Sequence, residues 1–167
     1  RSGNLREAPE WIPPSPAIRN RECARAYAAT VFTEALPGID CARSSALAFR
    51  LVGAPWLDAA HLCRSLAREA LPGAAFHPHR YRAGPGAWEG AELTGVRITV
   101  TDPDCFRPAT TSVVLLDHLA RQHGREALWR SPGVRPAFFD QLYGSPQTRL
   151  ALESGMPGQA LAESWRP

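Results

Sequence analysis

Two segments of the chain have different apolar periods, and together they restrict the fold to a mixture of helix and sheet. Between residues 57 and 70, apolar side chains recur at i, i+3 and i+4, which predicts an amphipathic helix ended by residues 71–73 (LPG). Residues 96–101 (VRITVT) alternate strictly and are rich in β-branched side chains, which predicts a strand. A chain of 167 residues suits one globular domain of this mixed class.

Weaker patterns predict the remaining elements in the first half of the chain. An alanine-rich helix is expected over 21–30, and strands are expected over 31–33, 46–52 and 74–82. The resulting order of elements favours an α/β fold (mixed α+β), with a small mixed sheet flanked by about four to five helices.

The second half of the chain is predicted to be helical. Thr110 and Thr111 are expected to cap one helix, because threonine side chains accept hydrogen bonds from exposed N–H groups of the first turn. Ser145 before Pro146 predicts the start of another helix, with Gly155 at its end. A last helix is expected to carry Leu161 and Trp165.

Prolines separate the start of the chain from the rest. Residues 1–18 are polar and then proline-rich, with the run WIPPSP at 11–16, and consecutive prolines impose extended geometry. We expect residues 1–18 to form an extended strap and residues 19–167 to form a single α/β domain.

The charged residues argue against nucleic acid as a partner. All 19 basic residues are arginine, but acidic residues are interleaved with them and the net charge is only +3. Arg19, Arg21 and Arg25 form the densest group near the N-terminus, and Glu22 lies among them, which favours a solvated face over a phosphate-binding stripe. No apolar run approaches the roughly 20 residues of a membrane span, so no span is expected.

The cysteines and histidines do not form a recognisable metal or disulfide motif. Cys23, Cys41, Cys63 and Cys105 contain no CxxC pair, so buried free thiols are expected. His77 and His79 would lie on one side of a strand, as a metal site requires, but a third ligand is missing. Solvent-facing or packed histidines are favoured over a zinc site, and we expect no metal and no cofactor.

Several side chains have the chemistry of a sugar site. Glu34 follows the predicted strand 31–33, Arg43 offers a hydrogen-bonding fork, and Trp56 could offer a stacking face, although a core position is favoured for Trp56. Asp102 and Asp104 follow the strand at 96–101, where ordinary turn chemistry is favoured over catalysis. One carboxylate is not sufficient evidence for a glycosidase active site, because glycoside hydrolysis usually needs two carboxyl groups.

Short motifs are spread in order over nearly the whole chain. They are WIPPSP at 11–16, GAPW at 53–56, LPG at 71–73, FHP at 76–78, GV at 95–96, TD at 101–102, FRP at 106–108, FDQLYG at 139–144, Arg149, and SW at 164–165. In this set and order the chain resembles the C-terminal part of the bacterial exo-β-N-acetylmuramidases of the NamZ type. That glycoside hydrolase family acts on peptidoglycan fragments.

The resemblance implies roles for particular residues. The family activity would be the release of terminal N-acetylmuramic acid from the non-reducing end of a glycan. Glu34 would be the acid/base or polarising carboxylate, Arg43 a clamp on the sugar or its lactyl carboxylate, and Trp56 a wall of the site. Asp58 and His79 would be further substrate-binding residues.

The chain departs from the family pattern around the expected sugar site. Family members have E-G-T-N-L-S-x-G-R-G-T before the GAPW motif, whereas residues 34–45 are EALPGIDCARSS. Glu34 matches after an insertion of one residue, and the family asparagine is absent. Ala42 and Ser44 replace the glycines that flank the arginine, so their side chains are expected to narrow the site.

The resemblance also implies a second domain. Family members have a Rossmann-like domain before this region, which is absent from this sequence, and their active site lies in the cleft between the two domains, a common place for a ligand site. We expect that domain, or another protein subunit, on the docking face, and this chain alone to be inactive. The alternative is a catalytically inactive relic acting as a structural or interaction subunit. A bacterial family member would be extracytoplasmic.

Overall fold

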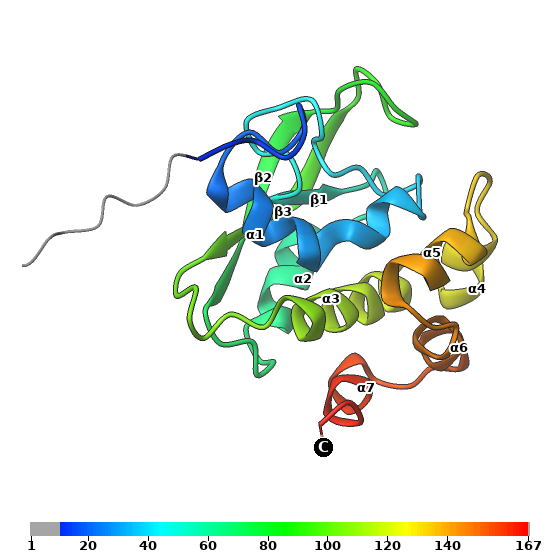
Figure 1. Cartoon of the computed structure of the whole chain (residues 1–167). Coiled ribbons are helices and arrows are strands. Elements are labelled where there is room, and N and C mark those ends of the chain that lie inside the picture. Colours follow the sequence, from blue (N-terminus) through cyan, green and yellow to red (C-terminus); the bar gives the residue numbers. More distant parts are fainter. Residues whose placement is uncertain (1–10, 167) are drawn as a thin grey trace, which may run out of the picture.

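The centre of the fold is a small antiparallel sheet. A computed structural model describes residues 11–166, so the first ten residues of the predicted strap lie outside the described part. The sheet contains β1 (Leu51–Gly53), β2 (Ala74–Arg82) and β3 (Glu92–Val100), in the order β1-β3-β2 (Figure 1). All pairings are antiparallel, and β2 and β3 form a hairpin over their full nine residues.

Helices cover the sheet and extend beyond it. Within the described residues they are α1 (Arg21–Thr30), the 3-10 helix η1 (Val31–Glu34), α2 (Ala59–Leu66), α3 (Pro108–His123), α4 (Arg125–Arg130), α5 (Pro136–Tyr143), α6 (Gln147–Ser154) and α7 (Gly158–Glu163). The predicted mixed α/β class is confirmed. Two details differ: over residues 11–166 the sheet is antiparallel throughout and there are seven α-helices.

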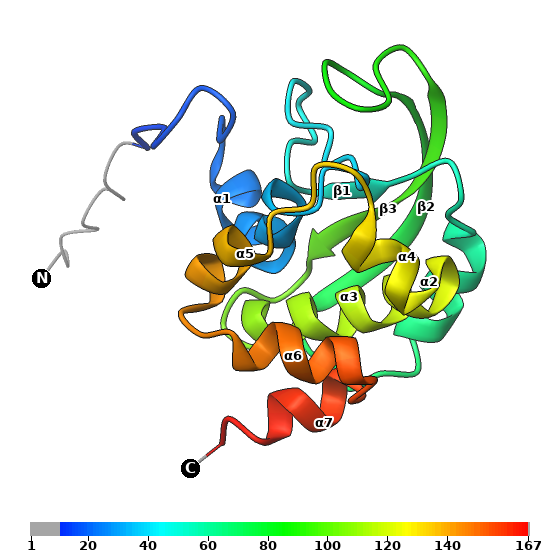
Figure 2. The same cartoon turned by 90° about the vertical axis from the view of Figure 1, so that its right-hand side faces the viewer.

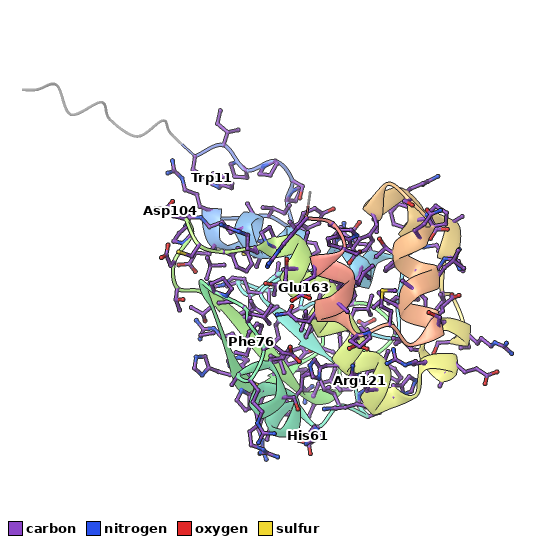
Figure 3. The ribbon with its side chains drawn as sticks, turned by 90° about the horizontal axis from the view of Figure 1, so that it is seen from below. Trp11, His61, Phe76, Asp104, Arg121 and Glu163 are labelled. Carbon is purple, nitrogen blue, oxygen red and sulfur yellow. The ribbon has the colours of Figure 1, made fainter. Side chains whose placement is uncertain are left out.

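The main core lies between one face of the sheet and helices α2 and α3. Val96 and Ile98 of β3 point into it and are almost completely buried. Leu62 and Leu66 of α2 pack into the same cluster, which explains the helical period of the sequence there. Figure 3 shows the resulting arrangement from below, with Phe76 on β2 and His61 on α2 at the same side of the molecule. No described helix is both long and apolar enough to cross a membrane.

Helix α3 is the element on which the C-terminal helices assemble. Nine of its 16 residues are buried, including the carboxylate-bearing Asp117. The Asp117 carboxylate accepts hydrogen bonds from Arg121 in α3, from Arg125 in α4 and from the Gly158 N–H at the start of α7. One buried charge thus joins three helices, and its partners satisfy its oxygens.

Helix α7 approaches the backbone of α3 closely. A Cβ atom at Gly158 would lie 2.6 Å from the Val113 carbonyl oxygen and from the Val114 Cα atom, so a larger residue would push the two helices apart. Figure 3, seen from below, shows α7 over α3, with Glu163 at the end of α7. This close contact brings the Gly158 N–H to within 3.1 Å of Asp117.

Two predicted strands are corrected. Residues 31–33 form the 3-10 helix η1, because the chain continues from α1 in helical turns. The threonines there bond to the preceding turns, Thr30 Oγ1 to the Ala26 carbonyl and Thr33 Oγ1 to the Thr30 carbonyl, which favours continued turning. Of residues 46–52, only Leu51 and Val52 are in a strand, since Phe49 has a left-handed φ of 61° that interrupts extended backbone.

Several helix ends can also be compared with their predictions. Asp58 caps α2, which is shorter than the predicted helix 57–70, and Gly155 ends α6 in the left-handed conformation as predicted. The prediction that Thr110 and Thr111 cap α3 is wrong. Pro108 occupies the first turn, where a missing N–H costs nothing, so both threonines lie inside the helix.

The four cysteines are free. Cys23 and Cys63 are buried as expected, and burial raises the pKa of the Cys63 thiol to about 11. Cys105 is exposed, which corrects the expectation of four buried thiols, because it lies in the turn between β3 and α3.

The first prediction tests the buried charge of Asp117. We expect Asp117→Asn to lower the free energy of unfolding by about 3 kcal/mol, because it leaves the Arg125 guanidinium without its anionic partner. Urea denaturation followed by circular dichroism measures this. Glu126→Gln is the control, because its ion pair with Arg130 is exposed on both sides and should change stability by roughly 0.5 kcal/mol or less. Equal effects of the two substitutions would contradict the role of Asp117.

Candidate functional site

Glu34 and Arg43, predicted to act on the same sugar, form an ion pair. The Arg43 Nη1 atom lies 3.5 Å from Glu34 Oε1. The Glu34 side chain is 18% exposed, whereas that of Arg43 is 62% exposed. A sheltered carboxylate therefore lies beside a guanidinium whose remaining N–H groups face open space.

Glu34 is held in place through its backbone. It is the last residue of η1, and its carbonyl accepts a hydrogen bond from the Arg135 guanidinium. The Arg135 guanidinium also lies 4.4 Å from the ring centroid of Phe138, and its backbone N–H donates to the Ala35 carbonyl at 3.0 Å. The segment just before α5 therefore fixes the position of Glu34.

Arg43 follows a strained turn. Ala42 has a left-handed φ of 50°, a conformation that side-chain-bearing residues adopt at a cost. Its N–H donates to Asp40 Oδ2 at 2.9 Å, and the Arg43 guanidinium lies 5.9 Å from the Phe49 ring centroid. Glycine, which the family resemblance predicts at position 42, would adopt this conformation without strain.

Asp40 connects this turn to two strands. Its backbone forms two hydrogen bonds with Gly53 at the end of β1, at 2.8 and 2.9 Å. The Tyr81 hydroxyl of β2 donates to Asp40 Oδ2 at 2.8 Å. Burial, and then the negative charge of Asp40, raise the pKa of Tyr81 well above its usual value, so the phenol stays protonated and remains a donor.

A glycine in β1 makes room for this contact. Gly53 in β1 pairs with Gly95 in β3, and a Cβ atom at Gly53 would collide with the Tyr81 hydroxyl. Tyr81 therefore reaches across the sheet to Asp40 over strands that carry no side chain at this point.

His79 lies on the same face of β2 as Tyr81. The two residues are two positions apart in the strand, and His79 pairs directly with Gly95. His79 is half-buried, whereas His77, on the same face, is exposed. Within residues 11–166, no group of three His, Cys, Asp or Glu side chains gathers in a way that could hold a metal ion.

Trp56 lines a separate pocket, to which Pro37 and Gly38 of the segment after Glu34 also contribute. Its ring stacks on His123 of α3 at a centroid distance of 4.2 Å and an interplanar angle of 17°. Trp88, from the loop between β2 and β3, forms another wall and donates its indole N–H to the Gly38 carbonyl at 2.9 Å. The pocket has a volume of about 270 Å³. Trp56 is half-buried and also packs against the main core.

Asp58 acts as the N-terminal cap of α2. Its Oδ1 atom accepts the His61 N–H at 2.8 Å, and its backbone exchanges hydrogen bonds with the Gln122 side chain at 3.1 and 3.3 Å. This carboxylate already has a structural partner, and its contact with substrate stays a prediction.

Comparison with known proteins identifies the family. The profile of the family described as "Exo-beta-N-acetylmuramidase NamZ, C-terminal" matches residues 25–167. The chain belongs to this family. It is 26% identical over 155 residues to "Peptidoglycan beta-N-acetylmuramidase NamZ" of Bacillus subtilis (strain 168), which covers 93% of this chain and 36% of the relative. The chain thus spans about a third of that relative's length.

A solved structure shows the same fold. A DUF1343 family protein from Bacteroides fragilis NCTC 9343 superposes with a TM-score of 0.84 at 21% identity, over 93% of this chain and 41% of that one. The chain therefore corresponds to a C-terminal domain of a larger protein in this family.

Sequence reasoning missed four residues that shape these two sites, namely Asp40, Tyr81, Trp88 and His123. Tyr81 alternates with His77 and His79 on the predicted strand 74–82, so the period of two could have placed it on the same face. Asp40 and His123 have no comparable sequence pattern, because their partners are distant in the sequence. Asp40 bonds to Tyr81, 41 residues away, and His123 stacks on Trp56, 67 residues away.

The second prediction concerns the bond between Tyr81 and Asp40. We expect Tyr81→Phe to lower the free energy of unfolding by about 1–2 kcal/mol, because a half-buried carboxylate loses a donor. Chemical denaturation measures the change. Tyr27→Phe is a matched control, since within residues 11–166 the Tyr27 hydroxyl makes no hydrogen bond, and it should leave stability nearly unchanged. A Tyr81→Phe protein as stable as the parent would contradict the role of this bond.

The third prediction concerns the strained turn. We expect Ala42→Gly to raise the free energy of unfolding by roughly 0.5–1 kcal/mol, because relief of the left-handed strain outweighs the extra chain entropy of glycine. Ala28→Gly on an exposed position of α1 should have the opposite sign and cost about 1 kcal/mol. Thermal and urea unfolding of both variants test this, and a loss of stability in Ala42→Gly would show that the turn is unstrained.

Proposed function

We propose that this chain is the C-terminal domain of an exo-β-N-acetylmuramidase, and that Glu34 and Arg43 are its contribution to the sugar site. The observation that carries the proposal is the pairing of a sheltered carboxylate with an open guanidinium 3.5 Å away. Membership of the NamZ family supports a peptidoglycan substrate. The reaction would release terminal N-acetylmuramic acid from the non-reducing end of a glycan fragment.

Arg43 is suited to the carboxylate that distinguishes N-acetylmuramic acid from other amino sugars. The lactyl group of this sugar ends in a carboxylate, which forms two parallel hydrogen bonds with a guanidinium. Arg43 is exposed enough to accept such a partner while one of its nitrogens stays near Glu34. The Phe49 ring limits the positions that the arginine side chain can adopt.

Glu34 would act as the acid/base or polarising carboxylate. Because most glycosidases use two carboxyl groups, a second must be supplied. Asp40 is the nearest other acid along this segment, and its Oδ2 atom already accepts hydrogen bonds from Tyr81 and Ala42. We therefore assign the second group to the domain that faces this one in the complete enzyme.

One observation favours the alternative of an inactive structural subunit. The Ser44 side chain lies so close to Gly84 that no Cβ atom fits at Gly84, and Ala42 adds a side chain beside Arg43. These two side chains occupy positions that glycine leaves open in the family pattern. A domain altered in this way would keep the fold and act as an interaction surface without binding the sugar.

The fourth prediction separates the two functions by binding. We expect N-acetylmuramic acid to shift the Arg43 side-chain N–H signal in NMR titrations of this chain, because its carboxylate would bond to the guanidinium. N-acetylglucosamine, which lacks the lactyl group, should leave that signal in place. Arg43→Ala should weaken binding of N-acetylmuramic acid at least about tenfold, as expected for loss of a charge-assisted pair.

Arg80→Ala is the matched control, since Arg80 is an exposed arginine on β2 and should bind the sugar like the parent. If Arg43→Ala and the parent bind N-acetylmuramic acid equally, Arg43 is not the clamp. If neither binds it, the interaction-subunit alternative is favoured.

A further inference from the structure

The pocket beside Trp56 has the form of a binding site that is distinct from the Glu34–Arg43 pair. Its walls come from five separated parts of the chain, and the principal lining residues are Pro37, Trp56, Trp88, His123, Ser131 and Pro132. Figure 2 shows that the loops contributing residues 37–38, 83–91 and 131–135 gather at one end of the molecule. Trp56 and Trp88 are both half-buried at this loop cluster, so part of each indole remains accessible to a ligand, although Trp56 also packs against the core.

The walls are held in place without a ligand. Trp88 is fixed by its indole bond to the Gly38 carbonyl, and Trp56 is fixed by stacking on His123. The Ser131 hydroxyl donates to the Ala127 carbonyl at 2.6 Å, so its oxygen remains available as an acceptor. The pocket is thus largely preformed, and little ordering is needed on binding.

The chemistry of the lining selects an uncharged ligand. No arginine, aspartate or glutamate lines this pocket among the described residues, in contrast to the pair at Glu34 and Arg43. Aromatic rings and prolines offer flat apolar surfaces, while His123 and Ser131 offer a small number of polar atoms. A sugar ring has the same composition, with one apolar C–H face and hydroxyl groups at its edge.

The size of the pocket limits the ligand to one ring. Sites for drug-sized ligands have volumes of about 300–1,000 Å³, and this pocket has about 270 Å³. A carboxylate such as the lactyl group would find no cationic partner there. The fitting occupant is a single neutral sugar.

The pocket is close to the Glu34–Arg43 pair along the chain. Pro37 follows Glu34 by three residues, so their Cα atoms are at most about 11 Å apart. The segment 131–135 contacts both places, because Pro132 lines the pocket and Arg135 bonds to the Glu34 carbonyl. This separation is within the length of a short run of linked sugar rings.

We propose that the pocket formed by Trp56, Trp88 and His123 binds the neutral N-acetylhexosamine next to N-acetylmuramic acid in the glycan. The proposal rests on the proposed function for the identity of the sugar, while the pocket itself is defined by its own residues. Trp88 stacks on the apolar face of the ring, and His123 and Ser131 contact its polar edge. The two places together would hold a charged sugar and an uncharged neighbour.

The test uses the indole N–H signals of the tryptophans. In NMR titrations with the methyl β-glycoside of N-acetylglucosamine, we expect the Trp56 and Trp88 signals to shift saturably and the Trp129 and Trp165 signals to stay unchanged. Trp88→Ala should weaken binding at least about tenfold, in line with loss of a stacking face. Trp165→Ala is the matched control, because Trp165 is also a partly exposed tryptophan but lies outside this pocket.

A second variant separates stacking from loop structure. Trp88→Phe keeps an aromatic face but loses the bond to Gly38, so binding should fall by less than in Trp88→Ala. Unchanged Trp56 and Trp88 signals, or equal binding by Trp88→Ala and the parent, would overturn the proposal. Equal loss in the alanine and phenylalanine variants would also overturn it, because the effect would then come from the loop.

The two proposals fail in different ways. Binding of the neutral sugar should be unchanged in Arg43→Ala. If the neutral sugar shifts the Trp56 and Trp88 signals while N-acetylmuramic acid leaves the Arg43 signal unchanged, the proposal for the pocket is supported. The proposed role of Arg43 in a muramidase site is then overturned. The opposite result overturns the pocket alone.

Discussion

The helical part of this domain depends on one buried negative charge. Asp117 on α3 holds Arg125 of α4 and the first N–H of α7, and Gly158 allows the close approach that this bond requires. Buried side chains of α3 belong to the same core cluster as Val96 and Ile98 of β3. A shift of Asp117 would therefore move α3 and, through the core, the sheet. The loops that carry the candidate sites are connected to these elements, at the end of α3 and at the ends of the strands.

The two candidate sites share one segment of the chain, and one site is charged whereas the other is aromatic. Residues 34–43 carry the ion pair on one side, and Pro37 and Gly38 line the aromatic pocket on the other. Asp40 fixes this segment to β1 and, through Tyr81, to β2. A substitution in the sheet near Gly53 would therefore change the position of Arg43, although the substituted residue makes no contact with Arg43.

The sequence predicted the parts of the fold that depend on local periodicity. The alternation at 96–101 and the extended segment 74–82 became β3 and β2, and the helical spacing after Asp58 became α2. The strand pattern failed at 31–33 because local threonine hydroxyl bonds favour continued turning there. It failed at 46–52 because Phe49 is left-handed, and its carbonyl accepts a hydrogen bond from Thr30, 19 residues away. Motif order identified the family, and it placed Glu34 and Arg43 together. It did not find Trp88, whose role depends on how the hairpin loop returns to Gly38.

The position of β2 at the edge of the sheet affects how readily two copies of the protein could associate through their strands. Within the described residues it pairs with β3 alone, so the backbone groups of alternate residues along its other side have no strand partner. Pro78 lies in the middle of this edge and has no N–H to offer, and Arg80 and Arg82 are exposed on either side of Tyr81. A strand from another molecule cannot complete a ladder across the proline, and the Arg80 side chains of two copies would repel each other, whereas Arg82 is paired with Glu92. Both features disfavour edge-to-edge pairing of this hairpin with a second copy.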